Sequence, residues 1–242
     1  KVLEAAGGKW NKKSQTHEFA KDPREALGIA VTEGKATNTK TLLQAFYTPK
    51  PLAERLVFAS GLTRGSRVLE PSCGDGSLLL AAADVMGTGG VYDAFDIDPE
   101  ALATAQARLN QRLLHNGVRP DHVAGCSIFT CCDFLAVEPT KLHNDPRSLN
   151  DGGRIYDTIL MNPPFQNGQD MAHVTHAWRF AKAGTTLAAI MWPAWQDAKT
   201  KAAEAFRALV ASAKDSKVED IEAGAFDDTN VRTVLLVMRK AG

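Results

Sequence analysis

The chain has 242 residues and no net formal charge, and 44% of its residues are hydrophobic. These values are typical of one large folded domain, or of a domain with an extension. No run approaches the roughly 18 apolar residues of a membrane span and no signal peptide is visible, so the sequence does not indicate a membrane or secreted protein.

The first fifty residues are more basic than the rest of the chain. They carry nine Lys or Arg against five Asp or Glu. Such an arm can contact phosphates, although charge alone slightly favours an ordinary solvated surface. Short helices are predicted over 1–6 and 23–32, the second with Asp22 as N-cap and Pro23 at its first position. We therefore expect residues 1–45 to form a basic, partly helical amino-terminal extension.

From residue 46 onward, predicted strands and helices alternate. A helix over 51–60 comes first, and helices over 77–86, 99–115, 171–183 and 199–213 follow. The predicted strands cover 67–70, 91–96, 127–132, a short run that ends at Asn162, 187–191, 218–222 and 231–239. Strand–helix alternation is typical of an α/β fold with helices on both faces of the sheet. We expect residues 46–242 to form one domain with a Rossmann-like, doubly wound, seven-stranded and mostly parallel sheet whose last strand is antiparallel.

The first predicted strand runs into a glycine loop, Glu70-Pro71-Ser72-Cys73-Gly74-Asp75-Gly76. Gly74 and Gly76 permit a tight turn into the next helix and let a ligand approach bare backbone. Asp96 ends the next strand, where an acidic side chain can accept hydrogen bonds from ribose hydroxyls. Asp133 and Phe134 follow the third strand and offer a carboxylate and a ring. Together these strand ends predict a slot for a nucleoside.

The central strand stops at Asn162-Pro163-Pro164-Phe165. Proline cannot donate to a sheet ladder and restricts the residue before it, so the strand must end at Asn162. A plain proline turn is one interpretation. The other is a binding site for a flat heterocycle with an exocyclic amine, because an amide oxygen and a carbonyl can accept its N–H groups while a ring stacks on its face.

These motifs, in this order, resemble those of class I S-adenosylmethionine-dependent methyltransferases. The resemblance covers about residues 46–240 and is to the amino-methyltransferases that include the DNA adenine-N6 enzymes. The stretch from Asn162 to Phe165 is similar to the catalytic NPPF motif of that family, whose enzymes methylate planar amino or amide nitrogens. Phe46-Tyr47-Thr48-Pro49 resembles the leading motif, whose threonine contacts the cofactor carboxylate.

The resemblance also implies a set of cofactor-binding residues. The stretch from Glu70 to Gly76 is similar to the family's glycine-rich cofactor motif. Asp96 is then expected to hold the ribose, and Ile97 to cover the adenine. Asp133 and Phe134 resemble the pair that contacts the adenine amine and ring. The implied S-adenosylmethionine residues are Tyr47, Thr48, Glu70, Pro71, Ser72, Cys73, Gly74, Gly76, Asp96, Ile97, Asp133, Phe134 and Asn162.

Three further aromatic residues are candidates for the substrate cleft. Phe226 lies between the last two strands, where the family places a second ring against the target base once that base has left the double helix. The alternative interpretation of Phe226 is ordinary packing. Trp192 and Trp195 flank Pro193 after the fifth strand, and core packing is expected for one of them. Phe165 completes the predicted substrate-binding set. His173 and His176 share a helix face, but without a third ligand they are expected to be surface or packing residues, and we expect no metal.

The four cysteines are Cys73, Cys126, Cys131 and Cys132. They form no Cys-x-x-Cys pair, so neither a zinc site nor a disulfide framework is indicated. Reduced thiols fit a cytoplasmic protein. A cytosine-C5 methyltransferase is excluded, because that chemistry needs a cysteine nucleophile after proline and the sequence contains no Pro-Cys.

The resemblance therefore predicts a DNA adenine-N6 methyltransferase. The alternatives are an RNA adenine-N6 methyltransferase, a protein glutamine N5-methyltransferase and a catalytically silent cofactor-binding subunit, the last disfavoured by the intact Asn162 to Phe165 turn. The basic arm favours nucleic acid, DNA more than RNA, as the partner. No segment of the chain is long enough for a separate recognition module. Recognition is therefore expected to be loose, or to come from the amino-terminal arm, an upstream segment or a partner protein.

Overall fold

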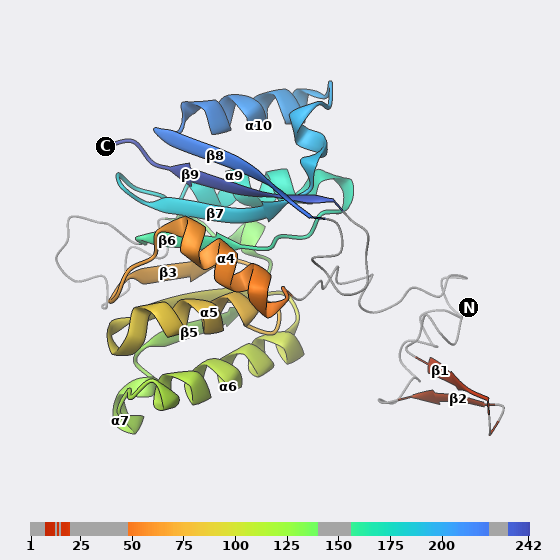
Figure 1. The fold of residues 1–242 in the computed structure, drawn as a ribbon, viewed down its shortest axis with the longest axis vertical. Coiled ribbons are helices and arrows are strands. Elements are labelled where there is room, and N and C mark those ends of the chain that lie inside the picture. Colours follow the sequence, from red (N-terminus) through yellow and green to blue (C-terminus); the bar gives the residue numbers. More distant parts are fainter. Residues whose placement is uncertain (1–7, 13, 15, 20–47, 140–155, 223–231) are drawn as a thin grey trace. The chain divides into compact units, whose positions relative to one another are not determined.

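The structure is a computed structural model that describes residues 8–12, 14, 16–19, 48–139, 156–222 and 232–242. The chain divides into two compact units, Lys1–Phe46 and Tyr47–Gly242. The helices predicted over 1–6 and 23–32 lie outside the described residues. In the first unit the structure describes a hairpin that the sequence analysis did not predict, formed by the antiparallel strands β1 (Gly8–Asn11) and β2 (Thr16–Phe19) (Figure 1).

The second unit is built on a seven-stranded sheet in the order β5-β4-β3-β6-β7-β9-β8. Its strands are β3 (Arg67–Glu70), β4 (Val91–Asp96), β5 (Ser127–Cys131), β6 (Thr158–Met161), β7 (Thr186–Met191), β8 (Asp215–Ile221) and β9 (Thr233–Arg239). The five strands from β5 to β7 are parallel, and β9 is antiparallel to both β7 and β8. The predicted mostly parallel sheet with an antiparallel last strand is confirmed.

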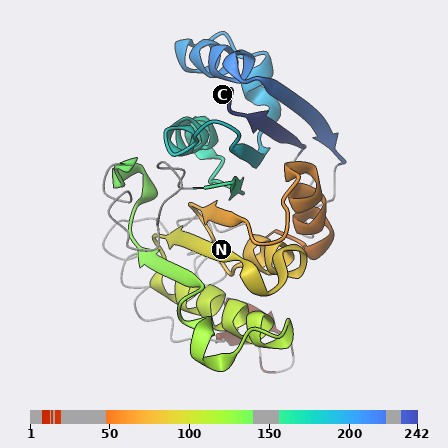
Figure 2. The same cartoon turned by 90° about the vertical axis from the view of Figure 1, so that its left-hand side faces the viewer.

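Helices cover both faces of this sheet. They are α4 (Lys50–Ser60), α5 (Ser77–Met86), α6 (Pro99–His115), α7 (Pro120–Val123), α9 (Gln169–Trp178) and α10 (Lys201–Ser212), with 3-10 turns η1 (Gly87–Gly89), η2 (Phe134–Ala136), η3 (Gln166–Gly168) and η4 (Pro193–Gln196). Apolar residues of α4, α5 and α6 form the core on one face, and those of α9 and α10 form the core on the other. Helix α4, in orange, and α9, in teal, lie on opposite sides of the sheet (Figure 2).

Local sequence signals explain most element boundaries. The left-handed Gly61, with φ 66°, ends α4, and the Asp98 carboxylate caps α6 by accepting from the Glu100 N–H at 2.9 Å. The Thr200 hydroxyl caps α10 in the same way. Helix α9 ends at Trp178, five residues before the predicted end, because the following amides bond to carbonyls three residues back.

The sheet reverses its winding at β3, which has β4 on one side and β6 on the other. In an open α/β sheet the crevice beyond the carboxyl ends of the strands at such a point is the usual ligand site. All four residues of β6 are buried, as expected for a strand covered on both faces. The end of β6 and the loop after β3 therefore define the region to search for a functional site.

Candidate active site

The glycine loop connects β3 to α5 and needs glycine at two positions. Gly74 and Gly76 have φ angles of 51° and 82°, in the left-handed region that favours glycine. A Cβ atom on Gly76 would lie 3.0 Å from the Cα and Cβ of Ala105 in α6. The loop is thus folded tightly against α6 at Gly76.

Asp96, at the end of β4, holds two loops together. Its Oδ2 accepts from the Gly74 N–H at 2.7 Å, and its Oδ1 accepts from the Asp98 N–H at 2.9 Å. Burial raises the pKa of the Asp96 carboxyl, and these amide hydrogen bonds oppose the rise. A carboxylate has about four acceptor positions, so Asp96 retains capacity for ligand hydroxyls.

Asp75 fixes the other end of the glycine loop. Its Oδ1 accepts from the N–H and the hydroxyl of Ser77, at 3.1 Å and 2.7 Å. Arg108 of α6 donates to both the carboxylate and the backbone carbonyl of Asp75. Sequence analysis did not identify Arg108, because its spacing from Asp75 carries no recognisable motif.

Glu70, the last residue of β3, is 1% exposed. Its Oε2 has no hydrogen-bond partner among the described residues. Burial, followed by the nearby Asp75 and Asp96, raises the pKa of Glu70 well above its ordinary value. The Ser72 hydroxyl is likewise buried without a partner in the described part of the chain. Two orphaned oxygens at one strand end indicate a place for a polar ligand.

Burial also governs the thiol in this loop. Cys73 is 4% exposed, and burial raises the pKa of its thiol, with Glu70 adding to the effect. The thiol therefore stays protonated and contributes packing rather than a nucleophile.

The turn after β6 is tied to the segment that precedes α4. The Asn162 Nδ2 donates to the Thr48 hydroxyl at 3.0 Å. Thr48 is 6% exposed, so this hydrogen bond is largely shielded from water. Pro163 is buried, Pro164 is half-buried, and the half-buried Phe165 packs against the core beneath α4 and α5. The bond sets the plane of the Asn162 amide.

The two candidate tryptophans after β7 have different surroundings. Trp195 is 5% exposed and packs edge-on against Phe206 of α10, with ring centroids 5.1 Å apart. Trp195 is thus the one of the two tryptophans that packs in the core, as expected for one of them, and its part in the substrate cleft stays a prediction. Trp192 is 46% exposed at the carboxyl end of β7, next to the strand that bears Asn162.

Asp170, which sequence analysis missed, holds the backbone at Trp192. It lies in the first turn of α9 and is 3% exposed. Its Oδ2 accepts from the Trp192 N–H and its Oδ1 from the Met171 N–H, both at 3.0 Å. Burial raises the pKa of Asp170, and these amides oppose the rise. A pairing across 22 positions leaves no local sequence signal.

The predicted adenine-binding residues are partly accessible and partly buried. Ile97 is 60% exposed, and the exposed Asp133 accepts from the Leu135 N–H at 2.9 Å. Phe134 is only 2% exposed and packs against Phe95 at a centroid distance of 5.3 Å. Phe134 thus belongs to the core as the structure stands, and its contact with an adenine stays a prediction.

His176 is a packing residue, as expected. Its Nε2 donates to the Val137 carbonyl at 2.9 Å, and Arg179 donates to its Nδ1 at 3.3 Å. Its ring packs edge-on against Phe134. His173 is half-buried, and burial lowers its pKa. No group of three metal-ligating side chains occurs within the residues that the structure describes.

Two predicted site residues, Tyr47 and Phe226, lie outside the described residues.

A hollow of about 330 Å³ lies at the other end of the parallel strands, near their amino ends. It is lined by the turn between α4 and β3 and by the amino ends of β6 and β7. Because ligands of open α/β sheets bind at the carboxyl ends of the strands, this hollow is not the candidate site.

Comparison with known proteins identifies similar sequences and folds. A family model described as N-6 DNA Methylase matches residues 32–241. The Type II methyltransferase M.TthHB8I of Thermus thermophilus is 31% identical over 118 residues, which is 49% of this chain and 20% of that protein. The chain thus spans about a fifth of the length of this curated relative.

Solved structures share the fold. The methyltransferase subunit of a type I restriction-modification system from Streptococcus thermophilus superposes with a TM-score of 0.61 at 19% identity, over 81% of this chain and 45% of that one. An RNA methyltransferase from Salinibacter ruber, in complex with S-adenosyl-L-homocysteine, superposes with a TM-score of 0.51 at 12% identity, over 81% of this chain and 94% of that one. At such identities the similarity shows the fold, and the predicted doubly wound fold is confirmed.

Proposed function

The chain belongs to the N-6 DNA methylase family, and from that premise we propose that it transfers a methyl group from S-adenosylmethionine to the exocyclic N6 of adenine in DNA. The observation that carries the proposal is the Asn162–Thr48 hydrogen bond, which fixes an amide at the carboxyl end of β6 beside the glycine loop after β3. A fixed amide and a following proline carbonyl suit an exocyclic amine, and the loop suits a nucleoside cofactor.

The residues at the ends of β3 and β4 fit the cofactor. The orphaned oxygens of Glu70 and Ser72 offer hydrogen bonds, and the glycine turn leaves its backbone bare. Asp96 would accept from the ribose hydroxyls with its remaining lone pairs. Ile97, exposed beside it, would cover the adenine. S-adenosylmethionine supplies an electrophilic methyl group when bound.

The chain's own residues then orient the target amine. The Asn162 Oδ1 and the Pro163 carbonyl accept hydrogen bonds from its two N–H groups. These hydrogen bonds draw the nitrogen lone pair out of conjugation with the ring and point it toward the methyl donor. No side-chain base is required, because the nitrogen becomes acidic only once it is methylated and its proton can then pass to water. Rate acceleration therefore comes from orientation and electrostatics.

The target base must leave the double helix to reach this turn. Extruding a paired base costs a few kcal/mol, which stacking inside the protein offsets. The ring of Phe165 follows Asn162 by three residues in the same turn, and the exposed Trp192 lies at the end of the neighbouring strand. We assign Phe165 and Trp192 to the two walls of the base pocket, and Pro164 to the stiffness of the turn.

We further propose that residues 1–45 are a basic extension and that residues 46–242 are the methyltransferase domain. Target recognition is loose, or comes from the amino-terminal arm, a partner protein or sequence outside this chain. All four cysteines are free thiols, which fits a cytoplasmic location. None of the helices in the described part of the chain has the length and apolar character required to cross a bilayer.

Product analysis tests this function. The protein is incubated with methyl-labelled S-adenosylmethionine and equal amounts of duplex DNA, single-stranded DNA, RNA and protein extract, and each is digested and separated. We expect N6-methyladenine from DNA. N6-methyladenosine from RNA, or methylated glutamine from protein, would replace the proposal by the corresponding alternative. No label in any substrate would indicate a silent subunit.

A further inference from the structure

Almost all the described side chains of the hairpin β1–β2 are exposed. Of the side chains that the structure describes on it, only Asn11 is half-buried, and the others are exposed: Lys9, Trp10, Lys12, Ser14, Thr16 and Glu18. A two-stranded hairpin is marginally stable in water. Local hydrogen bonds therefore contribute to its shape, and its exposed side chains can reach a partner.

Side-chain hydrogen bonds hold the turn of this hairpin. The Asn11 Nδ2 donates to the Glu18 carboxylate at 2.5 Å, and the Asn11 Oδ1 accepts from the Ser14 N–H at 3.4 Å. The hydroxyls of Ser14 and Thr16 are 2.8 Å apart. These bonds pre-organise a short ribbon, which reduces the entropy lost when it binds.

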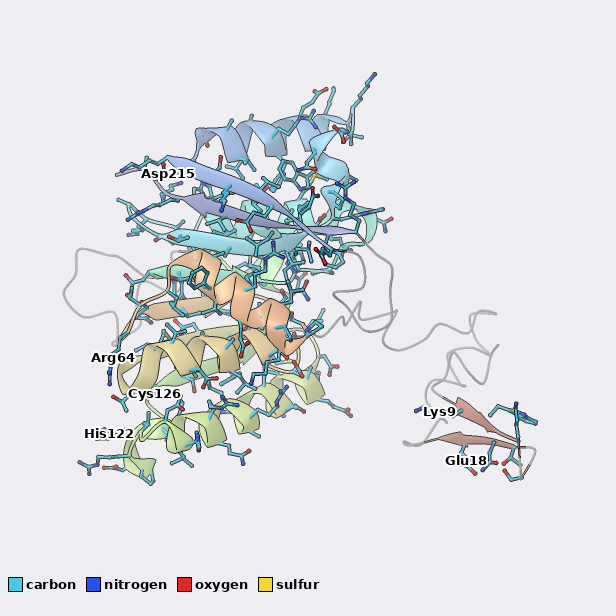
Figure 3. All side chains as sticks on the ribbon, viewed as in Figure 1. Lys9, Glu18, Arg64, His122, Cys126 and Asp215 are labelled. Carbon is cyan, nitrogen blue, oxygen red and sulfur yellow. The ribbon has the colours of Figure 1, made fainter. Side chains whose placement is uncertain are left out.

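Among the described side chains of the ribbon, the two lysines Lys9 and Lys12 outnumber the one carboxylate, Glu18, which leaves an excess of one positive charge. Lys9 lies directly opposite Glu18 in the strand register (Figure 3). Glu18, however, accepts from Asn11, and neither Lys9 nor Lys12 has an acidic partner among the described residues. Trp10 is 51% exposed and, by strand alternation, lies on the face opposite Lys9.

We propose that the β1–β2 hairpin binds the major groove of duplex DNA, an inference that rests on the DNA substrate proposed above. The B-DNA major groove admits a two-stranded β-ribbon, whereas the major groove of A-form RNA is too deep and narrow for side chains to read. Lys9 and Lys12 contact phosphates on either side of the groove. Trp10 makes an apolar contact with base edges, including thymine methyl groups.

Fluorescence anisotropy of the full chain with a labelled mixed-sequence duplex DNA tests this proposal without S-adenosylmethionine. The variants are the Lys9→Ala/Lys12→Ala double substitution and Trp10→Ala. Lys199→Ala/Lys201→Ala is the matched control, because it removes two exposed lysines next to α10 that also have no acidic partner in the described residues. Labelled single-stranded DNA and duplex RNA are measured in parallel, and circular dichroism checks that each variant is folded.

The double substitution is expected to weaken duplex DNA binding at least about tenfold at low salt. It should also reduce the slope of log K against log salt by about 2, since each phosphate contact contributes about 0.9. Trp10→Ala should weaken binding with the slope unchanged. The control should leave both quantities close to wild type.

Three results would overturn the proposal: no duplex binding by the wild type, an equal loss in the control, or a lower melting temperature in Trp10→Ala with unchanged affinity. Stronger hairpin-dependent binding to duplex RNA than to DNA would overturn it as well. Because binding is measured without methyl transfer, loss of hairpin-dependent affinity and loss of methylation are separate outcomes. The hairpin proposal and the proposed function can therefore fail independently.

Discussion

The Asn162 side chain and the Thr48 hydroxyl are joined by a hydrogen bond of 3.0 Å across 114 positions of the chain. In the proposed mechanism the Asn162 Oδ1 accepts a hydrogen bond from the target amine. Asn162→Ala is expected to lower methyl transfer by about 10²–10³-fold or more, the range for removing one oriented polar group. S-adenosylmethionine affinity should change little. Labelled methyl incorporation and calorimetric titration measure the two effects, and retained turnover would refute the assignment.

Thr48 tests whether orientation of that amide matters. Thr48→Val keeps the shape of the side chain and removes its hydroxyl, so the Asn162 amide loses the hydrogen bond that Thr48 accepts. We expect kcat to fall by roughly tenfold, about 1.4 kcal/mol in the activation barrier. Thr48→Ser, which restores the hydroxyl, should recover most of the rate. If Thr48→Ser is as slow as Thr48→Val, packing rather than the hydrogen bond is responsible.

The two tryptophans after β7 should respond differently to truncation. Trp195→Ala removes a buried ring and should destabilise the protein by about 3–5 kcal/mol, seen as a lower melting temperature. Trp192→Ala removes an exposed ring and should leave the melting temperature within a few degrees, while raising KM for DNA. Trp192→Phe retains a ring and should keep KM near wild type. A large melting-temperature loss in Trp192→Ala would assign Trp192 to the core instead.

Asp170 is expected to act on the substrate through Trp192. Asp170→Ala removes both acceptors, so the Trp192 backbone loses its anchor and KM for DNA should rise. Asp170→Asn keeps one acceptor and should be intermediate. Combining Asp170→Ala with Trp192→Ala should add little to KM, because both changes disturb the same contact. Fully additive effects would show that Asp170 stabilises the fold independently.

The raised pKa of Glu70 predicts that the stability of the protein depends on pH. Because its pKa is raised in the folded state, the folded protein binds this proton more tightly than the unfolded chain. Stability therefore falls as pH rises from the unfolded pKa of about 4.3 through the raised folded pKa, and returns as pH is lowered. Glu70→Gln should raise the melting temperature at alkaline pH by roughly 2–4 °C, the shift expected for about 1 kcal/mol.

The gain from Glu70→Gln should shrink as the pH approaches 4.3, because the wild-type carboxyl is then protonated as well. Glu204→Gln, on the exposed surface of α10, is the control and should not show this trend. Calorimetric scans across pH measure both variants. A gain that is independent of pH would mean that Glu70 affects stability through packing and not through its charge.

The sequence predicted the elements of the second unit, Tyr47–Gly242, well where patterns are local. The strand over 67–70 and the helices over 77–86 and 99–115 match β3, α5 and α6 to the residue, because glycine, proline and cap residues mark their ends. The strand over 91–96 likewise ends at Asp96 as predicted, whereas β6 ends at Met161, one residue before the predicted end at Asn162.

What the sequence did not predict depends on distant contacts. The pairing of Asp170 with Trp192 and that of Arg108 with Asp75 join separate elements, so no spacing rule reveals them. The hairpin β1–β2 lacks a clear apolar alternation, and its strands of four residues fall below what periodicity can resolve. Burial of Trp195 depends on its contact with Phe206, which the local sequence does not specify.

Strand order also constrains how the domain acquires its structure during synthesis. β8 leaves the ribosome before β9, yet its hydrogen-bonded neighbour in the sheet is β9, which lies between β7 and β8. Until β9 emerges, β8 has no neighbouring strand to pair with, and the exposed edge of β7 can pair with a strand of another chain. A chain stalled before residue 233 is therefore expected to aggregate, whereas release of the last strand closes the sheet in a single step.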